Sequence, residues 1–438
     1  MNRRQFVQCA ATGLSGISIR SALKTPITSE PLHINGPRLN RHLDELAEFG
    51  QTQTGGVNRI AYSEADLQGR EFVRGLMREA GLDVASDTAG NIIGRREGTE
   101  SGMPSLMFGS HIDSVPQGGN YDGPLGSLGA IEVAQTLAGH NMVLRHPIDV
   151  VVFQNEEGGK TGSRAMSGEL EPEELALVTH SGHTIGEGIR IIGGDPEYLD
   201  SVRRDPAGIV AYVELHIEQG GLLENEQIEI GVVAGIVGIK RWRVTIDGFA
   251  NHAGTTPMSD RQDALLAAAR FIETVNRVVT GMPGRQVGTV GQIEASPGAP
   301  NVIPGQVTLS LEIRDLEMHK IDRVYQAIET ESRELAEATK IQFSFDQFYL
   351  SRAAPTDEGI RQLVGDSAAE LGLSALRMPS GAGHDAQSIA LLAPIGMIFI
   401  PSVGGISHSP QEFSRPEDVV NGADVLLNTV LKLDEAFD

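Results

Sequence analysis

Residues 105–113 read Ser-Leu-Met-Phe-Gly-Ser-His-Ile-Asp, an apolar run that leads directly into an imidazole and a carboxylate. The apolar part, Ser105–Gly109, has counterparts further along the chain at Ile148–Phe153, Ile209–Leu215 and Ile395–Pro401. Short continuous apolar runs are typical of strands that are buried on both faces, as in parallel sheets. These four runs therefore predict the central strands of an α/β sheet.

Segments with helical spacing lie between several of these runs. Apolar residues recur three and four positions apart in Arg38–Phe49, Glu64–Ala80 and Leu125–Ala138. Strands that alternate with helices favour a largely parallel sheet that is covered by helices. We therefore expect an α/β main domain built around such a sheet.

A different pattern interrupts this alternation near residue 239. Its segments follow one another as strand, helix, strand, strand, helix and strand, which is the order of a ferredoxin-like unit. In that order they are Lys240–Ile246, Asp260–Val279, Val287–Glu294, Val307–Arg314, His319–Lys340 and Ile341–Phe348. The sequence thus predicts an inserted α+β domain at 239–350. It divides the main domain into two parts, 33–238 and 351–438.

Composition narrows the class of protein and its partners. The 438 residues include 35 Lys and Arg against 58 Asp and Glu, a formal net charge of −23. Such an acidic chain is a poor candidate for binding nucleic acid or an anionic membrane through its overall charge. The sequence has no run of about 18 apolar residues that would form a membrane anchor. Cys9 is the single cysteine, which excludes an internal disulfide and a Cys-rich zinc site.

The first residues have the pattern of an export signal. Arg3 and Arg4 are followed closely by Phe6, and the stretch from Val7 to Ile19 carries no charge. This arrangement resembles a Tat signal, the bacterial route for folded proteins. We expect residues 1–32 to be this signal and the protein to be periplasmic, whereas a basic tail without signal function would leave it cytoplasmic.

Each apolar run leads into residues that can bind a metal ion. In chain order, these residues are His111 and Asp113, Glu156 and Glu157, His216 and Glu218, and His408 and Glu412. In open α/β sheets, sites form outside the carboxyl ends of the strands. Imidazole nitrogen and carboxylate oxygen suit Zn²⁺, and also Mn²⁺, Co²⁺ or Ni²⁺. Four such strand ends predict a metal centre that is assembled from separate loops.

A further carboxylate lies in a glycine-rich segment, where Gly118, Gly119 and Gly123 surround Asp122. Glycines permit a backbone course that turns a carboxylate inward. A carboxylate between two cations can bridge them at about 3.5–4 Å, the spacing of two-metal hydrolases. Asp122 is therefore a candidate bridging ligand.

At these residues the sequence resembles the M20 metallopeptidase superfamily. More narrowly, it is similar to the branch of amidases, hydantoinases and carbamoylases. The matching motifs follow family order from about residue 37 to the end of the chain. They are Gly109–Val115, Gly118–Gly123, Asn155–Gly158, Glu214–Gly220, Asn251–Pro257, Pro300–Pro304, Gly383–Ala386 and Ser407–His408.

The resemblance implies a site with two divalent ions per subunit, with zinc the first expectation. The implied metal ligands are His111, Asp122, Glu157, His216 and His408. Asp113 would orient His111, as metal-bound imidazoles require. Glu156 would be the general base that takes a proton from the attacking water and later delivers it to the leaving nitrogen.

The resemblance also implies substrate contacts. Arg314 would hold the substrate carboxylate through a two-pronged contact. The positions of Gln219, Asn301 and His384 match family positions close to the substrate. His252 would reach the active site of a neighbouring subunit and stabilise oxyanion charge there. We therefore expect a homodimer formed through the inserted domain, which would also close over the metal site as a lid.

Two sequence features bear on the substrate. His216 occupies a position where the peptidase relatives usually carry a carboxylate. After Glu157 the chain reads Gly-Gly-Lys-Thr-Gly-Ser-Arg-Ala-Met-Ser-Gly168, whereas many relatives have an Arg-Phe pair soon after the two glutamates. This departure bears on the shape of the pocket rim. The favoured function is hydrolysis of ureido acids such as N-carbamoyl-L-amino acids, and the alternative is an allantoate amidohydrolase. A peptidase or aminoacylase is less favoured because of His216. The complete set of ligands and base argues against a non-catalytic binding protein.

Overall fold

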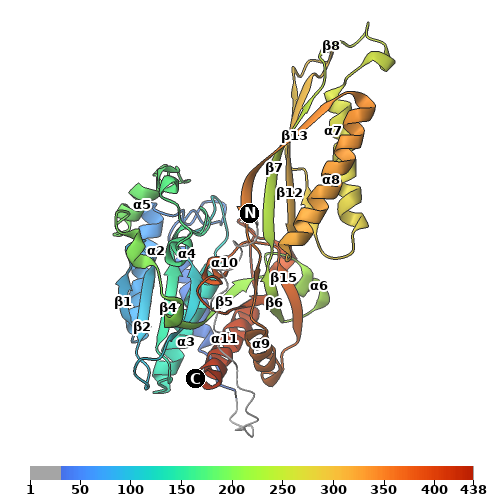
Figure 1. The fold of residues 1–438 in the computed structure, drawn as a ribbon. Helices are drawn as coiled ribbons and strands as arrows, with labels where there is room; N and C mark the ends of the chain where they lie inside the picture. Colours follow the sequence, from blue (N-terminus) through green and yellow to red (C-terminus); the bar gives the residue numbers. More distant parts are fainter. Residues whose placement is uncertain (1–30, 438) are drawn as a thin grey trace, which may run out of the picture.

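The four predicted core strands lie side by side in the computed structural model, which describes residues 31–437 (Figure 1). They belong to a nine-stranded sheet with the order β1-β2-β4-β3-β5-β16-β6-β14, in which β15 also pairs with β6. The strands are β1 (Asp83–Ser86), β2 (Ile92–Arg96), β3 (Ser105–His111), β4 (Ile148–Phe153), β5 (Ile209–Ile217), β6 (Ile230–Ile236), β14 (Ala354–Pro355), β15 (Ala375–Ser380) and β16 (Ile395–Ile400).

The centre of this sheet is parallel, as predicted. Strand β3 pairs in parallel with both β4 and β5, and β5 pairs in parallel with β16. Every residue of these four strands is buried, which explains why their sequences are continuous apolar runs. Because adjacent parallel strands end at the same edge, their carboxyl ends bring distant parts of the chain together.

Helices cover both faces of the sheet. One face packs against α1 (Gly36–Ala47), α2 (Glu64–Glu79), α3 (Pro124–Gly139), α9 (Glu358–Glu370) and α11 (Pro416–Ala436). The other face packs against α4 (Thr161–Ser167) and α10 (Asp385–Ile389). Helix α6 (Leu222–Glu226) adds the buried Leu223 to this second core, whereas α5 (Ile185–Ile191) is peripheral. The side chains alternate accordingly, since Phe108 of β3 lies in the first core and its neighbour Met107 in the second.

A second, antiparallel sheet rises away from the first (Figure 1). Its order is β10-β12-β7-β13, and β9 also pairs with β12. Its strands are β7 (Gly238–Asp247), β9 (Val287–Thr289), β10 (Ile293–Ser296), β12 (Gln306–Asp315) and β13 (Gln342–Ser351). Helices α7 (Ala264–Gly281) and α8 (Met318–Thr339) cover one face and bury residues such as Trp242 and Leu311. The other face carries polar residues, among them Arg241 and Glu312.

The predicted strand Val287–Glu294 is divided in the structure into β9 and β10. The pairing register with β12 shifts by one residue between these two short strands. At the break, the hydroxyl of Ser310 accepts the backbone N–H groups of Gly291 and Gln292. A side chain thus replaces the backbone partners that a continuous ladder would supply.

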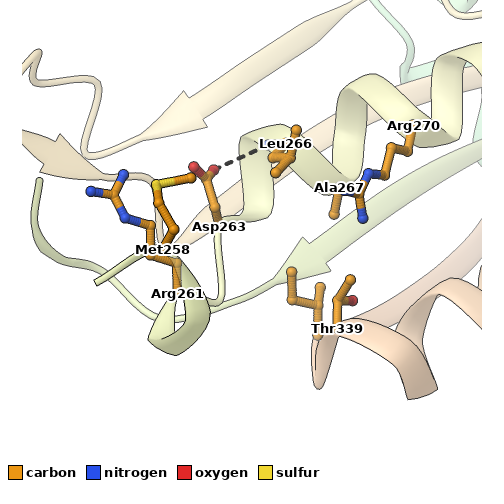
Figure 2. A pocket seen from close by; sticks show the side chains of 8 residues that line it. Met258, Arg261, Asp263, Leu266, Ala267, Arg270 and Thr339 are labelled. Carbon is orange, nitrogen blue, oxygen red and sulfur yellow. Dashed lines mark hydrogen bonds between the residues drawn. The ribbon is translucent and has the colours of Figure 1, made fainter. Parts of the chain in front are cut away.

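The far end of the second sheet carries a short ladder between β8 (Asn251–His252) and β11 (Val302–Ile303) (Figure 1). Helix α7 begins nearby at Ala264, four residues later than predicted, because Asp263 caps the N–H groups of Leu265 and Leu266 (Figure 2). Beside this cap is a cavity of about 70 Å³ that Arg261 helps to line. Arg261 donates to the carbonyl oxygens of Ala253 and Thr256, which ties down the loop that follows His252.

The remaining short elements are helices of the 3₁₀ type: η1 (Pro172–Ala176), η2 (Leu199–Val202), η3 (Pro206–Gly208), η4 (Met258–Asp260) and η5 (Val403–Gly405). Between residues 31 and 437, none of the helices combines the length and the apolar character needed to cross a bilayer. The predicted export signal lies, up to residue 30, outside the described part of the chain.

Candidate metal centre and active site

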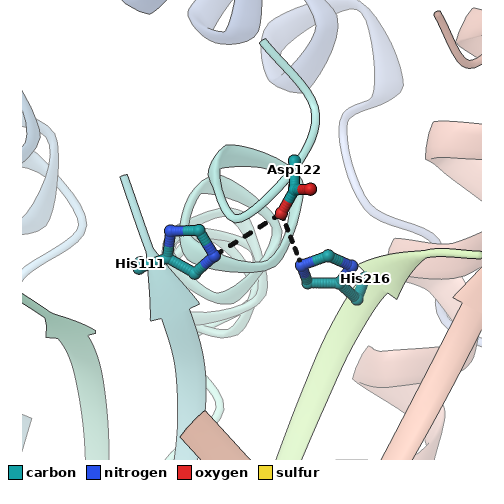
Figure 3. Close-up of side chains that lie close together, drawn as sticks. All are labelled: His111, Asp122 and His216. Atoms are coloured by element: carbon teal, nitrogen blue, oxygen red, sulfur yellow. Dashed lines mark ion pairs between the residues drawn. The ribbon is translucent and has the colours of Figure 1, made fainter. Parts of the chain in front are cut away.

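Three imidazoles converge on the carboxylate of Asp122. His111 ends β3, His216 lies in β5, and Asp122 precedes α3 (Figure 3). The Nε2 atoms of His111 and His216 lie 3.6 and 3.1 Å from Asp122 Oδ1. On the other side, Nε2 of His408 lies 3.3 Å from Asp122 Oδ2 and 3.6 Å from Glu157 Oε1. Asp122 is therefore shared by two groups of metal-binding side chains, one on each of its oxygens.

The hydrogen bonds of the imidazoles leave these nitrogen atoms free to bind a cation. Nδ1 of His216 lies 2.9 Å from the carbonyl oxygen of Ile217, and Nδ1 of His111 lies 3.1 Å from that of Asp113. A carbonyl oxygen only accepts, so Nδ1 carries a proton in both rings, and Nε2 is the atom that offers its lone pair to a metal ion once it is deprotonated. Nε2 of His216 is buried and has no hydrogen-bond partner. An imidazole nitrogen and a carboxylate oxygen face each other favourably only with a positive charge between them, either a proton or a metal ion.

The separations also suit a divalent ion. Zinc bonds of about 2.0–2.2 Å in a tetrahedral shell place the ligand atoms about 3.4 Å apart. The contacts of Asp122 with the three imidazoles lie between 3.1 and 3.6 Å. The donor set and its spacing therefore fit the metal centre that the sequence predicted.

The pKa shifts of the cluster also favour a bound cation. Burial lowers the pKa of His111, but the carboxylates of Asp122 and Glu156 outweigh it and hold this pKa well above its usual value. Burial works against ionisation of Asp122, yet the charge of His216 and bonds from the imidazoles hold its pKa well below the usual range. The pKa of Glu157 is raised well above its usual value by burial, then by the charge of Asp122. These directions show that the buried cluster favours positive charge beside the carboxylate of Asp122.

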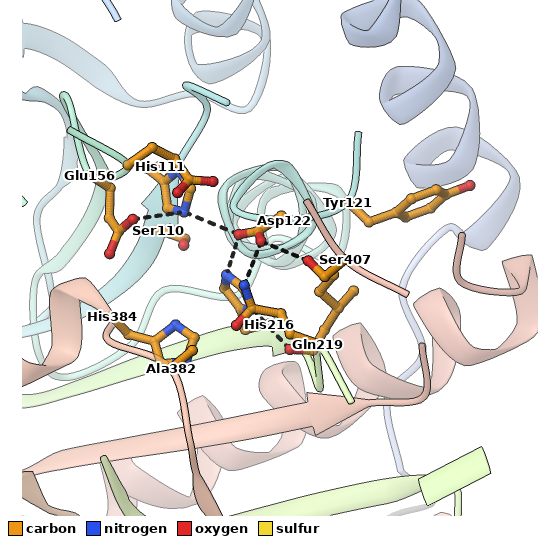
Figure 4. Close-up of polar contacts among 12 residues, drawn as sticks. Ser110, His111, Tyr121, Asp122, Glu156, His216, Gln219, Ala382, His384 and Ser407 are labelled. Carbon is orange, nitrogen blue, oxygen red and sulfur yellow. Dashed lines mark hydrogen bonds and ion pairs between the residues drawn. The ribbon is translucent and has the colours of Figure 1, made fainter. Parts of the chain in front are cut away.

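Glu156 lies beside the cluster without sharing Asp122. Its Oε2 is 3.8 Å from His111 Nε2, and burial raises the pKa of Glu156 to about 7 although His111 and Lys160 oppose the shift (Figure 4). The carboxylate of Asp113 accepts the backbone N–H groups of Glu156 and Glu157, each at 3.2 Å. Asp113 therefore shapes the turn that carries both glutamates, and its backbone carbonyl contacts His111.

A third group of possible ligands has a structural explanation. Glu214, His216 and His384 lie close enough to share an ion. The carboxylate of Glu214, however, already accepts from the hydroxyls of Ser110 and Tyr212 and from the N–H of Ala386. Glu214 therefore links β3, β5 and α10 through hydrogen bonds beneath His216 and His384, and it is not needed as a metal ligand.

Two of the predicted substrate residues line the cluster. Gln219 Nε2 donates to Asp122 Oδ2 at 2.5 Å (Figure 4). The ring of His384 packs edge-on against His216 with centroids 4.5 Å apart, and its Nε2 lies 2.8 Å from the hydroxyl of Ser380. Burial, reinforced by the charge of His216, holds the pKa of His384 well below its usual value. A neutral imidazole thus faces the site from the side of α10.

Arg314 connects the second sheet with this side of the site. Its Nη1 donates to the carbonyl oxygen of Gly381 at 2.6 Å, three residues before His384. Its Nε donates to Glu312 Oε1 at 2.7 Å, and the other oxygen of Glu312 accepts from Arg241 at 2.6 Å. Arg314 is therefore held in place by a carboxylate on its own strand.

The structure does not bring His252 and Asn301 to the cluster. Both lie at the far end of the second sheet, where Asn301 accepts the N–H of Ala253 through its backbone oxygen (Figure 1). His252 is exposed, and its Nδ1 accepts the N–H groups of Gly254 and Thr255. Within one subunit, these two residues lie apart from the other candidates.

Three residues around the site have roles that the sequence did not predict, including Glu412, which the sequence offered only as a possible metal-binding residue. Glu412 binds the loops of Asp122 and His408, and Glu312 holds Arg314. Lys160 donates to Gln387 of α10. The segment after Glu157, in which this chain differs from many relatives, therefore faces the loop of His384. A period-two pattern along β12 would have identified Glu312, because residues two apart share one face of a strand.

Comparisons with known proteins agree with this geometry. The chain matches the model of the peptidase family M20/M25/M40 over residues 107–432. It is 42% identical to an N-carbamoyl-L-amino acid amidohydrolase from Geobacillus stearothermophilus, with 91% of this chain and 99% of that protein covered. It is 34% identical to an allantoate amidohydrolase from Bacillus subtilis (strain 168), with 90% and 96% covered.

A solved structure agrees with the observed fold. A hydantoinase/carbamoylase family amidase from Burkholderia multivorans superposes with a TM-score of 0.84 at 35% identity, over 92% of this chain and 98% of that one. The sequence identities, the family match and the shared fold lead to one assignment. The chain belongs to the peptidase family M20/M25/M40, within its amidase, hydantoinase/carbamoylase branch.

Proposed function

We propose that this protein is a metal-dependent amidohydrolase that cleaves the carbamoyl C–N bond of ureido acids such as N-carbamoyl-L-amino acids. Water adds to the carbamoyl carbon, the C–N bond to the amino acid breaks, and the carbamate releases carbon dioxide and ammonia. The observation that carries the proposal is the single carboxylate of Asp122, shared by two ligand groups beside the buried Glu156. The similarity to carbamoyl amino acid amidohydrolases supports the substrate class.

The proposed centre holds two divalent ions per subunit. His111 and His216 would hold one ion, Glu157 and His408 the other, and Asp122 would bridge them. We propose zinc, with manganese, cobalt or nickel as alternatives, because these ions accept imidazole and carboxylate ligands. When bound, the ions supply Lewis acidity to the carbamoyl oxygen and lower the pKa of water.

Glu156 is the proposed general base. It lies within reach of the cluster, and its raised pKa of about 7 suits a group that first accepts and then returns a proton. It would take the proton from the attacking water and deliver it to the leaving nitrogen. Asp113 keeps Glu156 in place through the backbone of the turn.

Arg314 is the proposed contact for the substrate carboxylate. Its guanidinium has donors beyond those used for Glu312 and Gly381, and a planar fork suits a carboxylate. Gln219 and His384 would contact the carbamoyl group from the sides of Asp122 and His216. These residues would bind and orient the substrate.

We propose that residues 239–350 act as a lid and dimerisation domain between the two parts of a catalytic domain, 33–238 and 351–438. His252 and Asn301 would then complete the active site of the partner subunit, since they lie far from the cluster of their own subunit. The exposed apolar residues Leu265 and Ile272 of α7 offer a surface for such a dimer. Closure of the lid would also exclude water from the reaction.

The test is ammonia release by the metal-reconstituted protein from a substrate panel. The panel contains N-carbamoyl-L-amino acids, allantoate and ureidoglycolate, with N-acetyl amino acids and dipeptides as controls that are followed by product analysis. We expect turnover of N-carbamoyl-L-amino acids. Preferential turnover of allantoate would favour the second candidate, which the Bacillus subtilis relative supports. Cleavage of the acetyl or peptide controls alone would contradict the proposal.

A further inference from the structure

The carboxylate of Glu412 joins two loops that supply candidate metal ligands. Its Oε1 accepts the backbone N–H groups of Tyr121 and Asp122 at 2.9 and 3.1 Å. Its Oε2 accepts the hydroxyl of Ser407 at 2.9 Å and the N–H of His408 at 3.3 Å. The residue is only 6% exposed. One buried carboxylate therefore spans both loops with four hydrogen bonds.

The loop around Asp122 is shaped to admit this carboxylate. A Cβ atom on Gly119 would lie 2.2 Å from Glu412 Oε1, so only glycine leaves room for the contact. Ser407 also reaches Asp122 Oδ2 at 3.1 Å, and the two side chains point toward each other in Figure 4. Because Glu412 is occupied by these protein donors, it is not free to act as a metal ligand itself.

The two groups of ligands differ in what holds them in place. His111 and His216 lie in β3 and β5, whose separation is fixed by the pairing of the main sheet. His408 lies on a loop, in a left-handed conformation with φ of 54°, and its side chain is 50% exposed. No strand pairing positions His408, and Glu412 supplies a fixed link between its backbone and that of Asp122.

We propose that Glu412 is a positioning residue that sets the distance between Asp122 and His408. It therefore controls the affinity for the ion at Asp122, Glu157 and His408 more than the affinity for the ion at His111, Asp122 and His216. This inference rests on the two-ion centre of the proposed function. It does not depend on which ureido acid is the substrate.

The experiment measures metal retention, which is independent of activity. Full-length wild-type protein and Glu412→Gln are loaded with Zn²⁺ and dialysed against graded chelator, and bound zinc per subunit is then determined. In the variant an amide N–H₂ faces one pair of loop donors, so that pair loses its acceptor. We expect one ion to leave at roughly 10- to 100-fold less chelator than in the wild type, the range for lost supporting contacts. The other ion should leave at an unchanged chelator concentration.

Asp434→Asn is the matched control. Asp434 is 7% exposed and accepts the backbone N–H groups of Arg145 and His146 at 3.0 and 2.9 Å. It lies near the end of α11, whereas Glu412 precedes the start of this helix. This control should lower the melting temperature without changing zinc retention. If Glu412→Gln does not fold, Ser407→Ala removes the hydroxyl between Glu412 and Asp122 and should weaken the same ion.

The outcomes separate the inference from the proposed function. Equal retention of both ions by Glu412→Gln and the wild type would overturn the inference and leave the metal centre intact. Equal loss of both ions, with the same fall in melting temperature as Asp434→Asn, would reduce Glu412 to a general structural role and also overturn it. A wild-type protein that retains no divalent ion would overturn the proposed centre itself.

Discussion

Glu156 and Glu157 are neighbours in sequence, yet only Glu157 belongs to a ligand group around Asp122. Replacing Glu156 by Gln keeps the shape and removes the base, so we expect kcat to fall by about 10²- to 10⁴-fold at unchanged metal content. Replacing Glu157 by Gln should instead lower the metal content. Initial rates and metal analysis of both variants test the pair. Full activity of Glu156→Gln would remove this residue from the mechanism.

Glu312 should matter for substrates that carry a carboxylate. Glu312→Gln retains one acceptor for two arginines, so Arg314 loses its charged partner or shares a weaker one. A charge-assisted bond contributes about 1.5–3 kcal/mol, so we expect KM to rise roughly tenfold or more while kcat changes little. An N-carbamoyl amino acid amide, which lacks the carboxylate, should show no such change in KM.

The matched control for Glu312 is Glu331→Gln. Glu331 pairs with Arg277 between α7 and α8 of the same unit, on its solvent-exposed side. The kinetics of this control should equal those of the wild type. A KM increase of the same size for the acid and the amide substrate in Glu312→Gln would contradict a role through the substrate carboxylate.

The sequence predicted the ligand candidates because each follows a strand or a glycine-rich turn. His111 and Glu157 illustrate this, since an apolar run marks the strand and the polar residue marks its end. The role of Glu412 could not be predicted in the same way. Two of its four donors are backbone N–H groups of a loop about 290 residues earlier in the chain, and a backbone donor leaves no trace in the sequence.

Among the elements, α3 approaches the sheet unusually closely at Gly126. A Cβ atom there would lie 2.2 Å from the backbone oxygen of Leu215 in β5. Gly126→Ala should therefore push the helix away and lower the free energy of unfolding by about 2 kcal/mol or more. Gly139 of the same helix has no neighbour within 4 Å of its Cβ position, so Gly139→Ala should be neutral or stabilising by less than about 1 kcal/mol. Denaturant unfolding of both variants tests the difference.

Helix α2 carries a buried carboxylate in its first turn. Asp66 accepts the N–H of Tyr62, and burial raises its pKa from 3.8 to about 6 although Arg70 opposes the shift. The pKa is 3.8 in the unfolded chain and about 6 in the folded protein, so between these two values the folded protein binds more protons than the unfolded one. The contribution of Asp66 to the free energy of unfolding therefore falls as pH rises from about 4 to 6. Two pKa units correspond to a loss of up to about 3 kcal/mol.

The comparison with Asp66→Asn isolates this effect. The difference in unfolding free energy, wild type minus variant, should decrease between pH 4 and about 6 and stay constant above it. Glu79→Gln on the exposed face of the same helix controls for the loss of one charge. A difference that increases with pH would show that the charged form of Asp66 is the stabilising one.

The elements themselves were largely predictable, because burial sets their patterns. The strand Ile148–Phe153 was predicted with the bounds that the structure has. The division of Val287–Glu294 was not predicted, since it depends on the hydroxyl of Ser310 on a neighbouring strand. The start of α7 was also misplaced, because Asp260 and Asp263 are both possible caps and the sequence does not show which of them caps the helix.

At the scale of the whole molecule, the cluster and His252 lie in different parts of the subunit (Figure 1). If His252 acts across a dimer, a mixture of two inactive variants should regain activity. In a His252→Ala and Glu156→Gln mixture, the mixed dimer has one site with an intact Glu156 and an intact partner His252. Random re-association should restore about a quarter of the wild-type activity. Recovery should be absent without subunit exchange, and light scattering should report a dimer.

The position of His252 at the far end of the second sheet has a consequence for how the protein behaves in solution. Under the proposed dimer, a lone subunit holds every metal ligand and the base but lacks part of the machinery that acts on the substrate. Its turnover per subunit would then depend on its own concentration and fall on dilution below the dissociation constant of the pair. The rate per subunit would then report the fraction of subunits that are present as dimers.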